Sequence, residues 1–134
     1  MDFYDTLFFE GQNPSASLQS FRTPLTMCLE NSLETITSQM LGTISSIREC
    51  IFYQCTNLKR ITIPSSVTNI GDYVFGYCSS LVSVTVLATN PPELGEDVFA
   101  NTSEDLKIYV PSGSLQLYKD EWSEYENIIY EIED

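Results

Sequence analysis

One unit of the chain occurs twice, 23 residues apart, with every internal spacing preserved. Seven apolar positions mark the first copy: Ile44, Ile47, Phe52, Cys55, Leu58, Ile61 and Ile63. The second copy carries the same residue or a close apolar substitute at each position: Val67, Ile70, Phe75, Cys78, Leu81, Val84 and Val86. A fixed period of this length is typical of a solenoid, in which short repeats stack on one another. The period therefore predicts a solenoid and favours surface binding over catalysis.

Each unit is predicted to contain a short strand, a turn and a brief helical return or tight loop. The unit ends in the alternation of a strand, at Leu58, Ile61 and Ile63. Pro64 then turns the chain away, because proline cannot continue the hydrogen bonding between strands. Weaker copies flank the clear ones, at Leu33 and Ile36 upstream and at these downstream positions: Leu94, Phe99, Thr102, Ile108 and Val110. We therefore predict an α/β solenoid of about four units, with strands near residues 33–38, 58–63, 81–86 and 106–110.

The two ends of the chain differ from the repeats. Five apolar residues are spaced 3, 4, 3 and 4 apart, which is the stripe of an amphipathic helix: Leu115, Tyr118, Trp122, Tyr125 and Ile129. We expect this helix to cover the last strand edge, although the stripe could instead face a partner. The predicted organisation is an N-terminal segment at 1–27, repeats at 28–111, and a capping helix with an acidic tail at 112–134. Residues 1–27 are either a cap or a by-product of where the chain was cut.

The chain is strongly acidic, with six basic and nineteen acidic residues and a net charge of −13. Residues 93–134 hold twelve acids and two bases, so they carry −10 of that charge. Nucleic acid is excluded as a partner because its phosphates require Lys and Arg. We interpret the acidity as a source of solubility, with a basic partner for the C-terminal end as the alternative.

No apolar run is long enough for a membrane helix, and the acidic N-terminus lacks the features of a signal peptide. We therefore expect no membrane insertion. The compartment stays open among three readings: a cytoplasmic protein, a signal that was removed, or a piece of a longer chain.

The chain contains four cysteines: Cys28, Cys50, Cys55 and Cys78. Cys55 and Cys78 occupy the same slot of successive units, where the spacing of neighbouring strands permits a disulfide but parallel side chains disfavour it. We expect two small buried hydrophobic residues there. Zinc is not expected, because the chain has no histidine and no C-x-x-C pair. No other cofactor is predicted.

The run from Ile47 to Ile70 resembles the BspA-like leucine-rich repeat, whose pattern is F-x-x-C, a leucine, I-x-I-P and V-x-x-I. The closing stretch, from Asn90-Pro91-Pro92 to Trp122, is similar to the end of many such proteins. The resemblance covers roughly residues 28–130. It implies a right-handed, gently curved solenoid with a parallel sheet on its concave face. It also implies a bacterial surface or secreted protein, similar to adhesins and without a shared catalytic site.

The outward residues of the strands are the candidate binding residues. If Ile61 and Ile63 point into the core, Arg60 and Thr62 point out, and the other strands follow the same alternation. The first column is Thr35, Arg60, Ser83 and Lys107, and the second is Thr37, Thr62, Thr85 and Tyr109. The concave face of a solenoid commonly binds ligands. The alternative is that Ser and Thr simply suit exposed strands.

Catalysis is not expected. The absence of histidine excludes Ser-His-Asp and Cys-His arrangements, and carboxylate pairs such as Glu121 and Glu124 are predicted to be solvated helix residues. The leading hypothesis is a non-enzymatic module that binds a protein or glycan ligand at a cell surface. The alternative is a structural spacer or C-terminal cap fragment of a larger repeat protein. A carboxylate hydrolase is the remote third hypothesis, and the sequence leaves the oligomeric state open.

Overall fold

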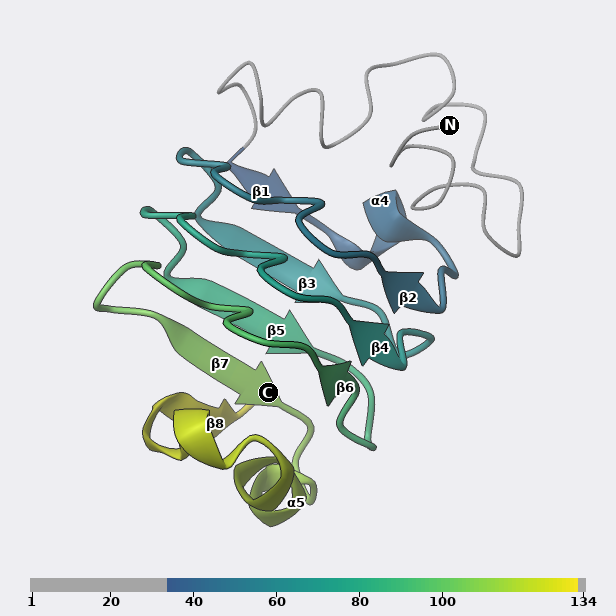
Figure 1. Ribbon diagram of the computed structural model, residues 1–134. Coiled ribbons are helices and arrows are strands. Elements are labelled where there is room, and N and C mark those ends of the chain that lie inside the picture. The colour runs from purple at the N-terminus through teal and green to yellow at the C-terminus, as the bar shows by residue number, and fades with distance from the viewer. Residues whose placement is uncertain (1–33, 133–134) are drawn as a thin grey trace.

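The computed structural model describes residues 34–132 and arranges them as two stacks of parallel strands (Figure 1). The larger stack, here called the front sheet, has the order β1-β3-β5-β7-β8. Its strands are β1 (Thr35–Ile36), β3 (Arg60–Ile63), β5 (Ser83–Val86), β7 (Lys107–Val110) and β8 (Ile129–Glu131). The smaller stack, the back sheet, consists of β2 (Ser46–Ile47), β4 (Asn69–Ile70) and β6 (Glu93–Leu94).

The front sheet follows the repeat period. Strands lie within or at all four predicted positions, and β3 pairs with β5 so that Ile61 lies beside Val84 and Ile63 beside Val86. All four of these side chains are buried, and the residues between them are at least partly exposed. β-Branched residues are well suited to such a half-buried pleated surface. The predicted alternation of inward and outward residues is therefore confirmed.

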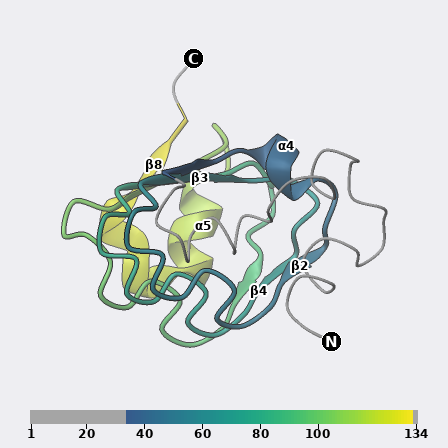
Figure 2. The same ribbon diagram turned by 90° about the horizontal axis from the view of Figure 1, so that it is seen from above.

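The back sheet is an element that the sequence did not predict. Each of its strands has two residues, and Ile47 pairs with Ile70, which pairs in turn with Leu94. Seen from above, the front and back sheets lie on opposite sides of the molecule (Figure 2). Between the back sheet and the next front strand, the chain runs through hydrogen-bonded turns: the Cys55 N–H donates to the Phe52 carbonyl at 3.1 Å. The return is therefore a tight loop and not a helix.

Backbone hydrogen bonds also connect the returns of successive units. The Phe52 N–H donates to the Val74 carbonyl at 3.1 Å, and the Phe75 N–H donates to the Val98 carbonyl at 2.9 Å. Gly71 and Gly95 occur at the same position of two units, where these backbones come closest. A Cβ atom added to Gly71 would lie 2.6 Å from the Glu49 nitrogen. Close stacking therefore requires glycine there.

The core lies between the two sheets and contains a column of phenylalanine rings. Phe52 and Phe75 stack with centroids 5.7 Å apart, and Phe75 and Phe99 stack at 5.5 Å. The edge of Tyr125 closes the column, with its centroid 5.1 Å from that of Phe99. The phenylalanine position of successive units therefore forms a stacked column in the core.

The cysteine slot belongs to this core. Cys55 and Cys78 are both buried. Cys78 carries a free thiol, and its Sγ donates to the Phe52 carbonyl oxygen at 3.0 Å. The two cysteines are therefore packing residues that are not joined by a disulfide. Cys28 lies outside the described residues.

The C-terminal segment corrects the predicted single helix. α5 (Leu115–Glu121) is followed by a 3-10 helix, η1 (Ser123–Ile128), and then by β8. α5 covers the end of the stack between the sheets, and two of its hydrogen bonds fix it there: the Tyr118 hydroxyl donates to the Ala88 carbonyl at 2.6 Å, and Trp122 Nε1 donates to the Pro92 carbonyl at 2.9 Å (Figure 2). The sequence predicted that a helix would cover the edge of β7. Instead, β8 pairs with that edge as a further parallel strand.

The N-terminal side contains a further difference. The short helix α4 (Ser38–Leu41) follows β1 directly, where the sequence predicted that a strand would continue to residue 38. The predicted cap at residues 1–27 lies outside the described residues. No helix between residues 34 and 132 is long and apolar enough to cross a membrane.

Candidate binding surface on the front sheet

The front sheet brings the first predicted column together. Thr35 pairs with Arg60, Arg60 with Ser83, and Ser83 with Lys107. These residues begin their strands, so they form one row at the amino end of the sheet. Arg60 and Lys107 are exposed, and Ser83 is half-buried.

The second predicted column is assembled only in part. Thr62 pairs with Thr85, and Thr85 pairs with Tyr109. Thr37 does not belong to this column, because β1 ends at Ile36 and Thr37 is the N-cap of α4. Its Oγ1 accepts a hydrogen bond from the Met40 N–H at 3.3 Å. A threonine side chain that can satisfy a free helix N–H favours this capping position over the strand.

The structure adds one residue that the sequence reasoning missed. β8 places Tyr130 beside Tyr109, with the ring centroids 6.1 Å apart and the planes inclined by 37°. The Nζ atom of Lys107 lies 6.0 Å from the centroid of the Tyr130 ring, within the range of a cation–π contact. Tyr130 is 43% exposed, so the second column ends in an accessible aromatic pair.

A signal for Tyr130 was present in the sequence. The run Ile128-Ile129-Tyr130 consists of residues that favour strands, and it follows the end of the helical stripe. The 3-and-4 spacing that continues to Ile129 concealed it. Ile129 is buried, as the stripe predicted, but it is buried from a strand.

The amino-end row has a charge opposite to that of the whole chain. Three of the six basic residues lie in this row or immediately beside it: Lys59, Arg60 and Lys107. Lys59 contacts the Glu34 carboxylate at 3.6 Å, and both side chains are about half exposed. The front sheet therefore presents basic groups in its amino-end row and, in the second column, hydroxyl groups followed by the tyrosines of β7 and β8.

This surface offers polar and aromatic contacts. Its Ser and Thr hydroxyls can donate and accept hydrogen bonds, and its tyrosines provide apolar area with a polar tip. Within residues 34–132, no group of His, Cys, Asp and Glu side chains could hold a metal ion. The front sheet therefore gathers hydrogen-bonding, basic and aromatic side chains on one surface.

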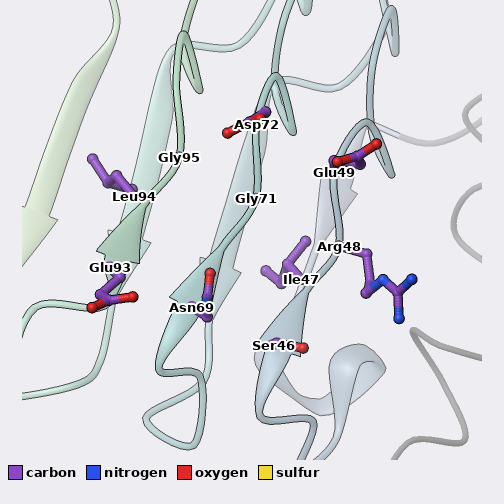
Figure 3. A pocket seen from close by; sticks show the side chains of 10 residues that line it. All are labelled: Ser46, Ile47, Arg48, Glu49, Asn69, Gly71, Asp72, Glu93, Leu94 and Gly95. Carbon is purple, nitrogen blue, oxygen red and sulfur yellow. The ribbon is translucent and has the colours of Figure 1, made fainter.

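A shallow groove of about 330 Å³ lies on the opposite side of the molecule, over the back sheet (Figure 3). Gly71 and Gly95 form its middle, Glu49 and Asp72 border one side, and Asn69 and Glu93 border the other. No residue of the predicted columns lines it. This groove could not be predicted from the sequence, because the back sheet that forms it was not predicted.

The family comparison agrees with the repeat and the sheets. A family model described as "BspA type Leucine rich repeat region (6 copies)" matches residues 18–129. The match includes both clear copies of the unit and every strand from β1 to β7. A search of curated proteins found no match.

Proposed function

The chain belongs to the BspA-type leucine-rich repeat family, and from this premise we propose that it is a non-enzymatic module that binds a protein ligand through its front sheet. Repeat proteins of this kind present extended sheet surfaces on which many side chains can contact one ligand. The proposed setting is the surface of a bacterial cell or its secreted proteins, where the module acts in adhesion. A glycan carried by the ligand is part of the same proposal.

The observation that carries the proposal is the composition of the front-sheet surface. In a chain of net charge −13, the row that contains Arg60 and Lys107 is basic, and it leads across hydroxyl groups to the Tyr109–Tyr130 pair. Arginine and tyrosine are enriched among the residues that dominate interface energies. A ligand with acidic groups that face the amino-end row and an apolar area that covers the tyrosine pair fits this surface.

The proposal is tested by measuring binding of the chain to immobilised extracellular matrix proteins. We expect Arg60→Ala, Thr62→Ala and Tyr109→Ala to weaken binding, with the Arg60 and Tyr109 variants losing roughly tenfold or more in affinity. Asn69→Ala is the control, because this exposed residue belongs to β4 of the back sheet and to neither front-sheet column. Unchanged binding by all three variants would show that the front sheet is not the binding face.

The alternative function is that of a spacer or C-terminal cap fragment of a larger repeat protein. The contacts between units favour it. Backbone hydrogen bonds and buried apolar residues join each unit to the next, and this joining needs no ligand. An open reading frame that continues upstream into further 23-residue units would support it. A reading frame without such units would remove this alternative.

A further inference from the structure

Two tyrosines of the second unit have backbone conformations that bulky residues rarely adopt. The φ angles are 57° for Tyr73 and 60° for Tyr77, in the left-handed region. The equivalent positions of the neighbouring units have the same conformation, with φ between 53° and 64°, at Cys50, Gln54, Asp97 and Asn101. The stacked returns therefore require the left-handed conformation at these positions, but they do not require tyrosine.

These tyrosines form a surface cluster with Tyr53 of the preceding unit. The centroid of the Tyr53 ring lies 6.3 Å from that of Tyr73 and 5.6 Å from that of Tyr77, with nearly perpendicular planes. Gly76 makes room for Tyr53, because a Cβ atom on Gly76 would lie 3.1 Å from Tyr53 Cδ1. Tyr73 and Tyr77 remain 38% and 44% exposed. The tyrosine cluster, Tyr53, Tyr73 and Tyr77, is thus an accessible aromatic patch.

Exposed carboxylates lie next to the tyrosine cluster. Glu49, Asp72 and Glu96 occupy one position of three successive units, immediately before the left-handed residues. Asp97 accepts a hydrogen bond from the Tyr73 hydroxyl and raises the pKa of Tyr73. Within the described part of the chain, none of these four carboxylates forms a salt bridge. The patch therefore combines aromatic rings with carboxylates that have no ion-pair partner among the described residues, and of these Asp72 accepts a hydrogen bond from the Glu96 N–H at 2.8 Å.

The groove over the back sheet continues from these carboxylates. Its middle is the backbone of Gly71 and Gly95, so side chains do not obstruct it there. Figure 3 shows Glu49 and Asp72 along one side and Arg48 pointing away from the two glycines. Glu93 adds a further carboxylate on the other side. The groove and the tyrosine cluster adjoin at Asp72, which lines the groove and directly precedes Tyr73.

We propose that the tyrosine cluster and the adjoining groove bind an extended basic segment of a partner protein. Lysine and arginine side chains can lie over the exposed tyrosine rings while the surrounding carboxylates neutralise their charge. The groove accommodates the backbone of such a segment. A second copy of the chain is disfavoured as the occupant by the net charge of −13 on each copy, although its front-sheet row is basic. This surface is separate from the front sheet and selects for the opposite charge.

The test uses the full chain and a fluorescent synthetic peptide of alternating lysine and serine, followed by fluorescence anisotropy. We expect Tyr73→Asn and Tyr77→Asn each to weaken binding roughly fivefold to tenfold, since each removes one cation–π partner. Asparagine tolerates the left-handed conformation, so these variants keep the fold. Leu117→Asn is the matched control, because Leu117 has a similar exposure of 41% but lies on α5. Equal weakening by Leu117→Asn, or none by the tyrosine variants, would overturn the proposal.

A second comparison separates a defined site from general attraction to an acidic protein. The double variant Glu49→Gln with Glu96→Gln and the double variant Glu104→Gln with Glu126→Gln lower the net negative charge equally. The first pair is expected to weaken peptide binding at least about fivefold more than the second, because only its carboxylates adjoin the cluster. Equal effects of the two pairs would contradict the proposal. Tighter binding of a neutral oligosaccharide than of the peptide would assign the cluster to glycans instead.

Discussion

The rings of Phe52 and Phe75 lie nearly parallel, with centroids 5.7 Å apart and planes 6° apart. The two residues hold the same place in successive units, so the distance between the rings reflects the distance between the units themselves. Phe99 continues the column at 5.5 Å. Truncating the Phe75 ring therefore removes stacking contacts with both Phe52 and Phe99.

Phe75→Ala is expected to lower the free energy of unfolding by about 3–5 kcal/mol, because it leaves a cavity in the middle of the column. Urea denaturation followed by circular dichroism measures the loss. Leu87→Ala, at a residue that is 38% exposed, is the control and should stay within about 0.5 kcal/mol of the parent. A loss below about 1 kcal/mol for Phe75→Ala would mean that the ring does not have this central place.

Gly71 and Gly113 are expected to respond to substitution for different reasons. Gly71 lacks space, so Gly71→Ala should cost about 1–3 kcal/mol and Gly71→Asn should cost more. Gly113 has φ +94° and no atom within 4 Å of an added Cβ, so only its conformation resists substitution. Asparagine tolerates that region, so Gly113→Asn should be milder than Gly113→Ala. Thermal unfolding of the four variants checks the order, and the same order at both glycines would contradict this distinction.

Tyr118 is expected to make stability depend on alkaline pH. Burial raises the pKa of Tyr118 well above the ordinary tyrosine value of about 10. The folded state therefore holds the proton more tightly than the unfolded state. The resulting stabilisation is fully present below pH ~10 and is lost as the pH rises above it towards the folded-state pKa.

Urea denaturation between neutral pH and pH ~11 measures this loss. Tyr118→Phe should flatten the decline while lowering stability at neutral pH by about 1 kcal/mol, because the hydrogen bond to the Ala88 carbonyl is lost. Burial also raises the pKa of Tyr125, so a residual slope is expected to remain. An unchanged slope in Tyr118→Phe would rule out Tyr118 as a source of the effect.

Thiol labelling should distinguish the cysteines by their positions. Cys50 is partly exposed, whereas Cys55 and Cys78 are buried. Burial, together with Glu49 and Asp72, raises the pKa of Cys50, so its labelling at neutral pH should be slow and should accelerate as the pH rises. Iodoacetamide labelling followed by peptide mass spectrometry is expected to modify Cys50 in the folded protein and Cys78 only after denaturation. Modification of Cys78 at the rate of Cys50 would show that the core is open.

The front strands and the phenylalanine column could be predicted because buried side chains leave a periodic record in the sequence. The alternation of Ile61 and Ile63 with Arg60 and Thr62 fixed which residues point outward. The back sheet left no such record. Its strands have two residues each and are specified by backbone pairing and by Gly71, whose role depends on a neighbouring unit that is close only after folding.

The ends of the candidate surface could not be predicted for a related reason. The spacing of Tyr125 and Ile129 correctly identified residues that contact the core, but it could not distinguish a helix from a 3-10 turn followed by a strand. Tyr130 was missed as a result. Thr37 was assigned to the sheet because a strand and a helix N-cap both accept threonine, and the choice depends on Met40 three residues later.

The contacts between units have a consequence for how such a chain can change in length. Each unit meets the next through matched backbone hydrogen bonds and equivalent apolar residues, so a tandem copy of residues 64–86 would bring its own complementary surfaces on both sides. Within residues 34–132, α4 and the C-terminal segment with α5, η1 and β8 depart from this pattern. Units can thus be added along the stacking axis with the same contacts between neighbours. Gene duplication can therefore change the length of the stack without requiring a new interface.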